Sequence, residues 1–204
     1  MKITNTLASL IVVTSSFAAF ADQTNQESRH SLTIAANSFE QAGVGFEGTS
    51  LKARFQIWTN EEDLLKLYMG GQIDDLTNGD TNKHAINQSE YYLGIRLGGN
   101  SDTYYFFEEG TIQTKEYAEN QTAIINSGAI WRLGVKTDLL SKPYVTKKGN
   151  TLDPFVRASL EYKDITSSDL GYNLEIGFDD LSVSYRHFPD TEESSLNLNF
   201  SANF

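Results

Sequence analysis

Alternation of apolar and polar residues with a period of two runs through most of this chain and limits what it can fold into. One clear instance has an apolar set interleaved with a mostly polar one, namely Tyr91, Leu93, Ile95 and Leu97 against Glu90, Tyr92, Gly94 and Arg96. Successive side chains of a β-strand point to opposite faces, so the pattern predicts strands with two unlike faces. No helical period of comparable length occurs, and we expect an all-β protein.

The alternating segments suit a closed barrel. They form about ten strands, each near the length that crosses a bilayer when tilted. Short turn-like runs at 59–63, 98–102 and 179–180 separate some of them, and a long polar loop is expected at Asp74–Gln88. An even count brings both termini to the periplasmic side, as in single-chain bacterial barrels. We therefore predict a closed antiparallel up-and-down transmembrane β-barrel.

Two features leave the strand count open between ten and eight. The connection Asp138–Leu152 is long but falls on the expected periplasmic side, so it is either an insertion or a sign that the count is wrong. Eight strands would result if Leu32–Ala36 and one neighbouring strand lay outside the barrel. At eight to ten strands, side chains are expected to fill the lumen, since open porins need about sixteen strands.

The distribution of charge favours a membrane barrel over a soluble one. One face of the strands is apolar almost without a charge, whereas the other carries charges of both signs. A soluble barrel would reverse this arrangement. The expected inward charge network consists of Arg54, Arg96, Arg132, Arg157, Arg186, Glu90, Glu161 and Glu175. Glycines on the same face, Gly94 and Gly134 among them, are expected to make room for the arginines. A soluble periplasmic β-protein is the alternative, because a half-exposed sheet gives the same stripe.

The N-terminal segment predicts export. Lys2, an apolar run over Leu7–Val13 and the small residues Ala19 and Ala21 form a secretory signal peptide over residues 1–21. Residues 22–30 are expected to form a periplasmic tail, and residues 31–204 the barrel. Cleavage changes the net charge from −11 to −12, because Lys2 is removed. This acidity argues against a nucleic-acid partner.

The C-terminal strand predicts an assembly signal. Its apolar residues alternate with polar ones and end on Phe204, and such an ending resembles the signal that the outer-membrane assembly machinery reads. Phe200 and Phe204 are its candidate residues. The chain also has 12 Phe, 10 Tyr and 2 Trp, from which membrane-interface girdles could be built. The candidates for the girdles are Trp58, Trp131, Tyr68, Tyr91, Tyr162, Tyr172 and Tyr185.

Four segments resemble the YfaZ-type outer-membrane proteins of gammaproteobacteria. They are Gly43–Phe46, Leu51–Asp63, Phe155–His187 and the ending Asn199–Phe204. The resemblance lies in the pattern of strands and turns, and the connection Asp138–Leu152 departs from it. It implies a small outer-membrane barrel with no established activity. OmpA/OmpX-type barrels are similar in architecture alone.

The sequence contains no recognisable catalytic or metal-binding constellation. His187 is followed two residues later by Pro189, so the His-x-Ser pair that resembles lipid A deacylases is missing, and Ser195 has the opposite facing parity. The segment Asp74–Asp80 has Leu76 where a calcium ligand belongs and lacks a closing Glu. We therefore expect no enzyme activity, no cofactor and no metal site.

These observations predict an integral protein of the bacterial outer membrane with both termini in the periplasm. Its expected role is structural or in surface interaction, with the loop Asp74–Gln88 facing outside. A narrow channel for small solutes or ions is the first alternative, and a lipid-modifying enzyme the second. The expected partners are outer-membrane lipid, lipopolysaccharide and the assembly machinery, and the chain is expected to be a monomer.

Overall fold

The structure is a computed structural model that describes residues 30–62, 64–78, 84–98, 102–118, 122–140, 144–145, 151–178 and 180–203. The expected signal peptide, nearly all of the expected tail and Phe204 lie outside the described residues. His30, expected at the end of the tail, instead begins the first strand and pairs with Phe55. No helix in the described ranges is long and apolar enough to cross a membrane.

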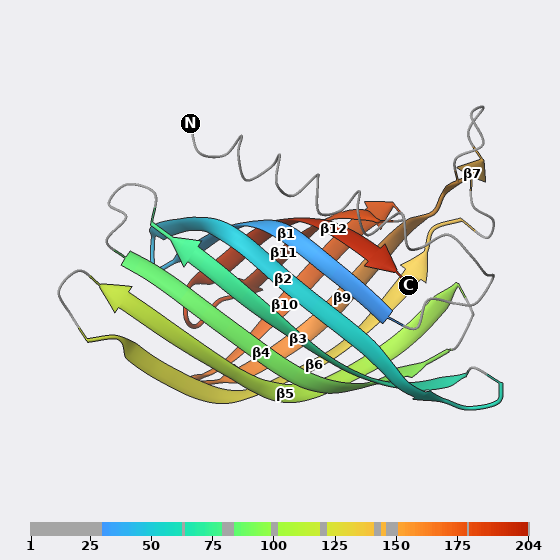
Figure 1. Cartoon of the computed structure of the whole chain (residues 1–204), viewed down its shortest axis with the longest axis horizontal. Helices are drawn as coiled ribbons and strands as arrows, with labels where there is room; N and C mark the ends of the chain where they lie inside the picture. Colours follow the sequence, from blue (N-terminus) through green and yellow to red (C-terminus); the bar gives the residue numbers. More distant parts are fainter. Residues whose placement is uncertain are drawn as a thin grey trace.

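Ten antiparallel strands close into one barrel, as the alternation predicts (Figure 1). In sequence they are β1 (His30–Gln41), β2 (Val44–Thr59), β3 (Leu65–Thr77), β4 (His84–Leu97), β5 (Thr103–Ala118), β6 (Ile124–Asp138), β9 (Pro154–Asp164), β10 (Ser168–Phe178), β11 (Leu181–Phe188) and β12 (Glu193–Asn203). Each strand pairs with its sequence neighbours in the barrel, and β1 pairs with both β2 and β12. Closure leaves no barrel strand with an unpaired edge.

The long connection between β6 and β9 is an insertion, which removes the eight-strand alternative. It contains two short strands, β7 (Tyr144–Val145) and β8 (Thr151–Leu152), that pair only with each other. In Figure 1, β7 projects away from the barrel. Because β6 and β9 still pair directly, from Ala129↔Asp164 to Asp138↔Phe155, the insertion does not disturb the order of the barrel.

The two ends of the barrel differ. β1 begins and β12 finishes at the same end, here named the terminal end, which also carries the β7–β8 insertion. The opposite end, named the hairpin end, has short links only, at 42–43, 78–83, 119–123, 165–167 and 189–192. The prediction of a long loop at Asp74–Gln88 is therefore wrong. Its polar residues continue the β3–β4 ladder, where Asn87 Nδ2 donates to Asp75 Oδ1 at 2.8 Å.

The outer surface carries a belt of exposed apolar side chains. Leu93, Leu133 and Tyr91 are exposed by 61%, 61% and 59%, and similar residues occur on every barrel strand from β2 to β12, with Leu160 on β9. Trp58 joins the belt, although strict alternation predicts that it faces inward. A β-bulge between Gln56 and Trp58 shifts the register by one residue, and Ile57 and Trp58 are both exposed.

Candidate functional site in the barrel lumen

The register of three adjacent strands sets opposite charges side by side inside the barrel. Arg132 of β6 pairs directly with Glu108 of β5 on one side and with Glu161 of β9 on the other. Directly opposite side chains on one face of an antiparallel pair lie close enough to interact. The strand pairing itself therefore places one guanidinium between two carboxylates.

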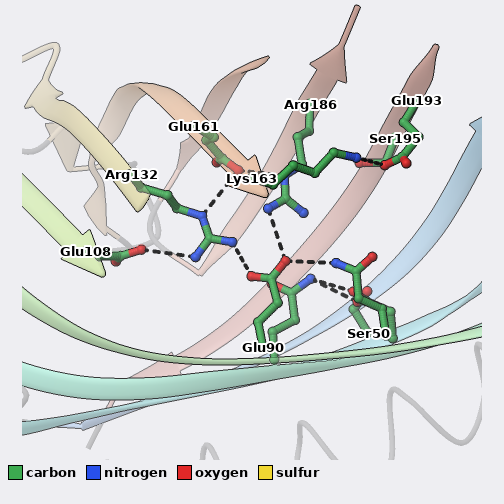
Figure 2. Close-up of polar contacts among 12 residues, drawn as sticks. Ser50, Glu90, Glu108, Arg132, Glu161, Lys163, Arg186, Glu193 and Ser195 are labelled. Atoms are coloured by element: carbon green, nitrogen blue, oxygen red, sulfur yellow. Dashed lines mark hydrogen bonds and ion pairs between the residues drawn. The ribbon is translucent and has the colours of Figure 1, made fainter. Parts of the chain in front are cut away.

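Arg132 is the centre of this arrangement (Figure 2). Its Nη1 lies 3.4 Å from Glu108 Oε2, its Nε lies 3.2 Å from Glu161 Oε2, and its Nη2 forms an ion pair with Glu90 Oε2. The side chains of all four residues are at most 7% exposed. Burying a charge costs several kcal/mol unless it is paired and hydrogen-bonded, and here one cation is surrounded by three anions.

Arg186 connects the two sides of the barrel. Its Nη2 lies 3.1 Å from Glu90 Oε1, and its Nε lies 2.7 Å from Glu161 Oε2. β11, which carries Arg186, and β4, which carries Glu90, are five steps apart in either direction around the ten-stranded ring. The contact therefore spans the lumen between diametrically opposite strands. Figure 2 shows Arg186 pointing down from one wall to Glu90 on the other.

Two more arginines meet the same layer from the terminal side. Arg157 Nη2 and Arg54 Nη2 lie 3.5 and 3.7 Å from one oxygen, Glu108 Oε1, which also accepts a 3.0 Å hydrogen bond from the Tyr68 hydroxyl. Arg157 also lies 3.9 Å from Glu175 Oε2. We name the whole set the charge layer: Arg54, Glu90, Glu108, Arg132, Arg157, Glu161, Glu175 and Arg186.

The structure places all eight residues of the expected charge network inside the barrel. Seven of them belong to the charge layer, and Arg96 lies with its guanidinium carbon 3.8 Å from the centre of the Tyr104 ring. Sequence reasoning missed Glu108, the carboxylate that contacts three arginines. The aromatic run 104–107 hides the alternation there, and only pairing of β5 with β6 opposite Arg132 could have revealed which face Glu108 occupies.

The inward glycines accommodate aromatic rings, which corrects the expectation that they make room for arginines. A Cβ on Gly94 would overlap the ring of Tyr68, and one on Gly134 would overlap the ring of Phe106. Tyr68 and Phe106 are 5% and 2% exposed. Tyr68 is therefore a lumen residue, and its assignment to an interface girdle is wrong.

On the hairpin side of the charge layer, four apolar residues on β1–β4 form a cluster inside the barrel, here named the apolar cap, that the sequence analysis did not predict. Phe46, Leu76 and Ile86 are each 2% exposed and pack together, with Phe39 against them. The cap residues point inward although most apolar residues of the strands point outward, so the general alternation rule hides them. The cavities found beside the cap are small, about 40 and 50 Å³.

On the terminal side of the charge layer lies a much larger space, here named the terminal cavity. Its volume is about 570 Å³. The lining extends from His30 and Asn203, at the terminal end, to Glu161 and Arg186 of the charge layer. The lumen is thus a polar chamber at one end and a packed interior at the other.

The described residues assemble no catalytic or metal constellation. His187 lies beside Tyr172 and Tyr185 on the outer face, with ring centroids 5.6 and 6.3 Å away, whereas Ser195 is buried inside. The two therefore lie on opposite sides of the wall. Within the described ranges, no group of three or more His, Asp or Glu could hold a metal ion.

No protein-family model and no curated protein matches this chain, so the resemblance to YfaZ-type proteins stays a prediction. Among solved structures, it is similar to the translocator domain of the autotransporter NalP from Neisseria meningitidis (12% identity, 100% of this chain and 98% of that one, TM-score 0.44). It is also similar to the attachment invasion locus protein Ail of Yersinia pestis (12%, 87% and 100%, TM-score 0.44) and to neisserial surface protein A (8%, 86% and 96%, TM-score 0.41). At such low identities and TM-scores, function has to be inferred from this chain's own residues.

Proposed function

We propose that this protein is an integral β-barrel of the bacterial outer membrane with a non-enzymatic, structural role and a lumen closed by the charge layer. The observation that supports the proposal is the contrast between the outer and the inner face of the barrel wall. The outer face exposes an apolar belt, whereas the inner face buries paired charges that reach across the lumen. A membrane barrel needs both, because lipid surrounds it and every backbone polar group must be paired internally.

The apolar belt supports a lipid environment. Soluble monomers rarely expose contiguous apolar patches of more than a few hundred Å². Here exposed Leu, Ile, Val, Phe and Tyr side chains follow one another around the ring of strands, for example Leu93, Phe107 and Leu133 on β4, β5 and β6. Exposing such a surface to water costs about 25 cal/mol per Å², and lipid removes that cost.

A polar extension beyond the belt supports an orientation. On the hairpin side, the outer face of β2–β5 becomes polar, with Thr49, Asp75, Asn87, Gln113 and Lys115. We infer that this extension stands outside the cell among lipopolysaccharide headgroups and that the terminal end faces the periplasm. Because the links at the hairpin end are short, surface contacts would be made by strand ends. The segment expected to form a long loop instead continues β3 to Thr77 and resumes as β4 at His84.

The same reasoning supports the partners proposed from the sequence. A closed ring leaves no strand edge for pairing with a second copy, which favours a monomer. Folding into the outer membrane requires the assembly machinery, for which the chain end at Phe200 and Phe204 is the proposed signal. Phe200 pairs with Ile34 and Leu181 at the seam between β1, β12 and β11.

A narrow channel is the second candidate, favoured by the volume of the terminal cavity. It would require solutes to pass both the Arg186–Glu90 contact and the apolar cap. Because side chains from opposite walls meet in the middle of the lumen, we favour the closed barrel.

Fractionation of cell envelopes tests the proposed location. The full-length protein is expected in the outer-membrane fraction after a urea wash, and it should migrate differently on gels with and without heating. Protease added to intact cells should cleave a tag inserted at the Ala42–Gly43 turn and spare a tag inserted in the β7–β8 connection. Recovery as soluble periplasmic material would contradict the membrane proposal, and the opposite cleavage pattern would contradict the orientation.

A further inference from the structure

The terminal cavity has a charge opposite in sign to that of the whole protein. The chain carries a net charge of −11, yet eight Lys and Arg and only four Asp and Glu line this cavity. Cavities lined by one sign of charge and surrounded by low-dielectric walls concentrate ions of the opposite sign. The excess of positive charge on the lining therefore favours an anionic ligand.

Charge pairing becomes weaker from the charge layer toward this cavity. Arg132, deepest in the layer, contacts three carboxylates. Arg54 and Arg157 instead share one oxygen, Glu108 Oε1, at 3.7 and 3.5 Å, and Glu175 adds only a 3.9 Å contact to Arg157. The charge layer itself has four Arg and four Glu and is neutral, so the cation excess of the lining comes from Lys52, Lys66, Arg96 and Lys136 against Asp138 and Asp153.

Donors on these two arginines remain unused. The Nε atoms of Arg54 and Arg157 are buried and have no hydrogen-bond partner in the described part of the chain. Lys52, which also lines the cavity, lies 5.9 Å from the centre of the Tyr92 ring and forms no ion pair with any described residue. Guanidinium groups match carboxylate and phosphate geometry, and charge-assisted hydrogen bonds to them are strong.

Two hydrogen-bond acceptors without donors also belong to the cavity lining. Asn173 Oδ1 on β10 and Asn197 Oδ1 on β12 are buried and lack a hydrogen-bond donor among the described residues. A hydroxyl group is a donor of the size and charge that suits such an acceptor. The lining therefore combines anion-binding groups with hydroxyl-binding groups.

We propose that the terminal cavity is a binding site for a small hydroxylated polyanion, a molecule with two or more carboxylate or phosphate groups. Arg54 and Arg157 bind the anionic groups, Lys52 adds charge, and Asn173 and Asn197 accept hydrogen bonds from hydroxyl groups. The cavity volume of about 570 Å³ suits this ligand class, since small-molecule sites span about 300–1,000 Å³. The ligand enters from the terminal end, because the charge layer closes the other side.

This inference goes beyond the proposed function and does not depend on it, because binding is measurable in detergent. Citrate and fructose 1,6-bisphosphate serve as carboxylate and phosphate probes, titrated calorimetrically into the purified full-length protein. We expect at least one of them to bind, with an affinity that falls as salt concentration rises. Glucose and putrescine, which are neutral and cationic, should give no binding heat at the same concentrations.

Two variants and a control identify the site. Arg157→Gln and, separately, Lys52→Gln should each weaken binding of the anionic probe, Arg157→Gln by about tenfold or more. Lys115→Gln removes the same charge from the outer face of β5 and should leave binding unchanged. Lys52→Gln breaks no ion pair among the described residues, so it remains informative if Arg157→Gln does not fold, as judged by heat-dependent gel migration. The proposal is overturned if neither probe binds, or if folded Lys52→Gln and Lys115→Gln bind as tightly as the unaltered protein.

Discussion

Arg186 on β11 and Glu90 on β4 meet in the middle of the barrel, with Nη2 and Oε1 3.1 Å apart, although their strands lie on diametrically opposite sides of the ring. Glu90 is fully buried and also binds Arg132, so one carboxylate connects two arginines from different parts of the wall. These side-chain contacts join opposite walls of the barrel, in addition to the backbone hydrogen bonds between neighbouring strands.

Removal of the shared carboxylate should therefore destabilise the barrel. Glu90→Gln leaves Arg132 and Arg186 buried with one charge partner fewer, and breaking a buried ion pair in this way costs about 3–5 kcal/mol. Urea unfolding in lipid vesicles measures the change in the free energy of unfolding. Glu47→Gln, at an exposed outward-facing position near the hairpin end, is the control and should change it by less than about 0.5 kcal/mol. Equal effects of the two variants would mean that the charge layer contributes no stability.

The outer face should be sensitive to charge within the belt and tolerant beyond it. Leu133 is 61% exposed and lies between Phe107 and Leu160, whereas Gln113 lies between Ser89 and Ser127 on the same outer face. Leu133→Arg should lower the free energy of unfolding in lipid by about 2–4 kcal/mol, and Gln113→Arg by about 0–1 kcal/mol. If the two substitutions cost the same, the limits of the belt drawn here are wrong.

The ring of Phe106 packs on Gly134, so a side chain at this glycine should destabilise the barrel. A Cβ on Gly134 would collide with the Phe106 ring and the Ala158 carbonyl oxygen, whereas one on Gly45 would have no neighbour within 4 Å. Gly134→Ala should destabilise the barrel by about 1–3 kcal/mol, as overpacking does elsewhere, while Gly45→Ala should be close to neutral. Unfolding experiments on both variants in the same lipid provide the comparison, and a neutral Gly134→Ala would show that the ring can move away.

The alternation of residues predicted a closed barrel of about ten strands, because one face of each strand had to be uniform, but it left eight strands as an alternative. It could not predict features that depend on pairing between strands. Asp74 and Asp75 look like a loop, yet β3 continues through them, since Asp74 accepts hydrogen bonds from Gln72 inside the barrel and Asp75 accepts one from Asn87 outside.

Residues that point into the lumen could be predicted where polar and apolar residues alternate along a strand. They could not be predicted where the two faces of a strand carry similar residues. Arg132 and Glu161 belong to the first class. Glu108 and the cap residue Phe46 belong to the second, because Glu108 follows four aromatic residues and Phe46 faces inward despite being apolar. Trp58, a candidate for the girdles, faces outward as a girdle residue must, because a bulge between Gln56 and Trp58 shifts the register there.

The proposed assembly signal predicts a defect in folding yield. Deletion of Phe204 should reduce the amount of folded, heat-modifiable barrel in outer membranes several-fold. Tyr117→Ala, at an exposed aromatic residue near the hairpin end, is the control. Phe39 would be unsuitable, because it packs against the apolar cap. Normal accumulation of the folded truncated protein would show that Phe204 is not an assembly signal.

Conductance of the unaltered protein in a planar lipid bilayer tests the closed lumen most directly. Vesicles that contain the folded full-length protein are fused with the bilayer, and insertion is verified by recovering heat-modifiable protein from the same vesicles. Because the Arg186–Glu90 contact crosses the middle of the lumen, we expect no channel openings above the protein-free baseline. Steady openings of reproducible size would contradict the closed barrel and favour the channel.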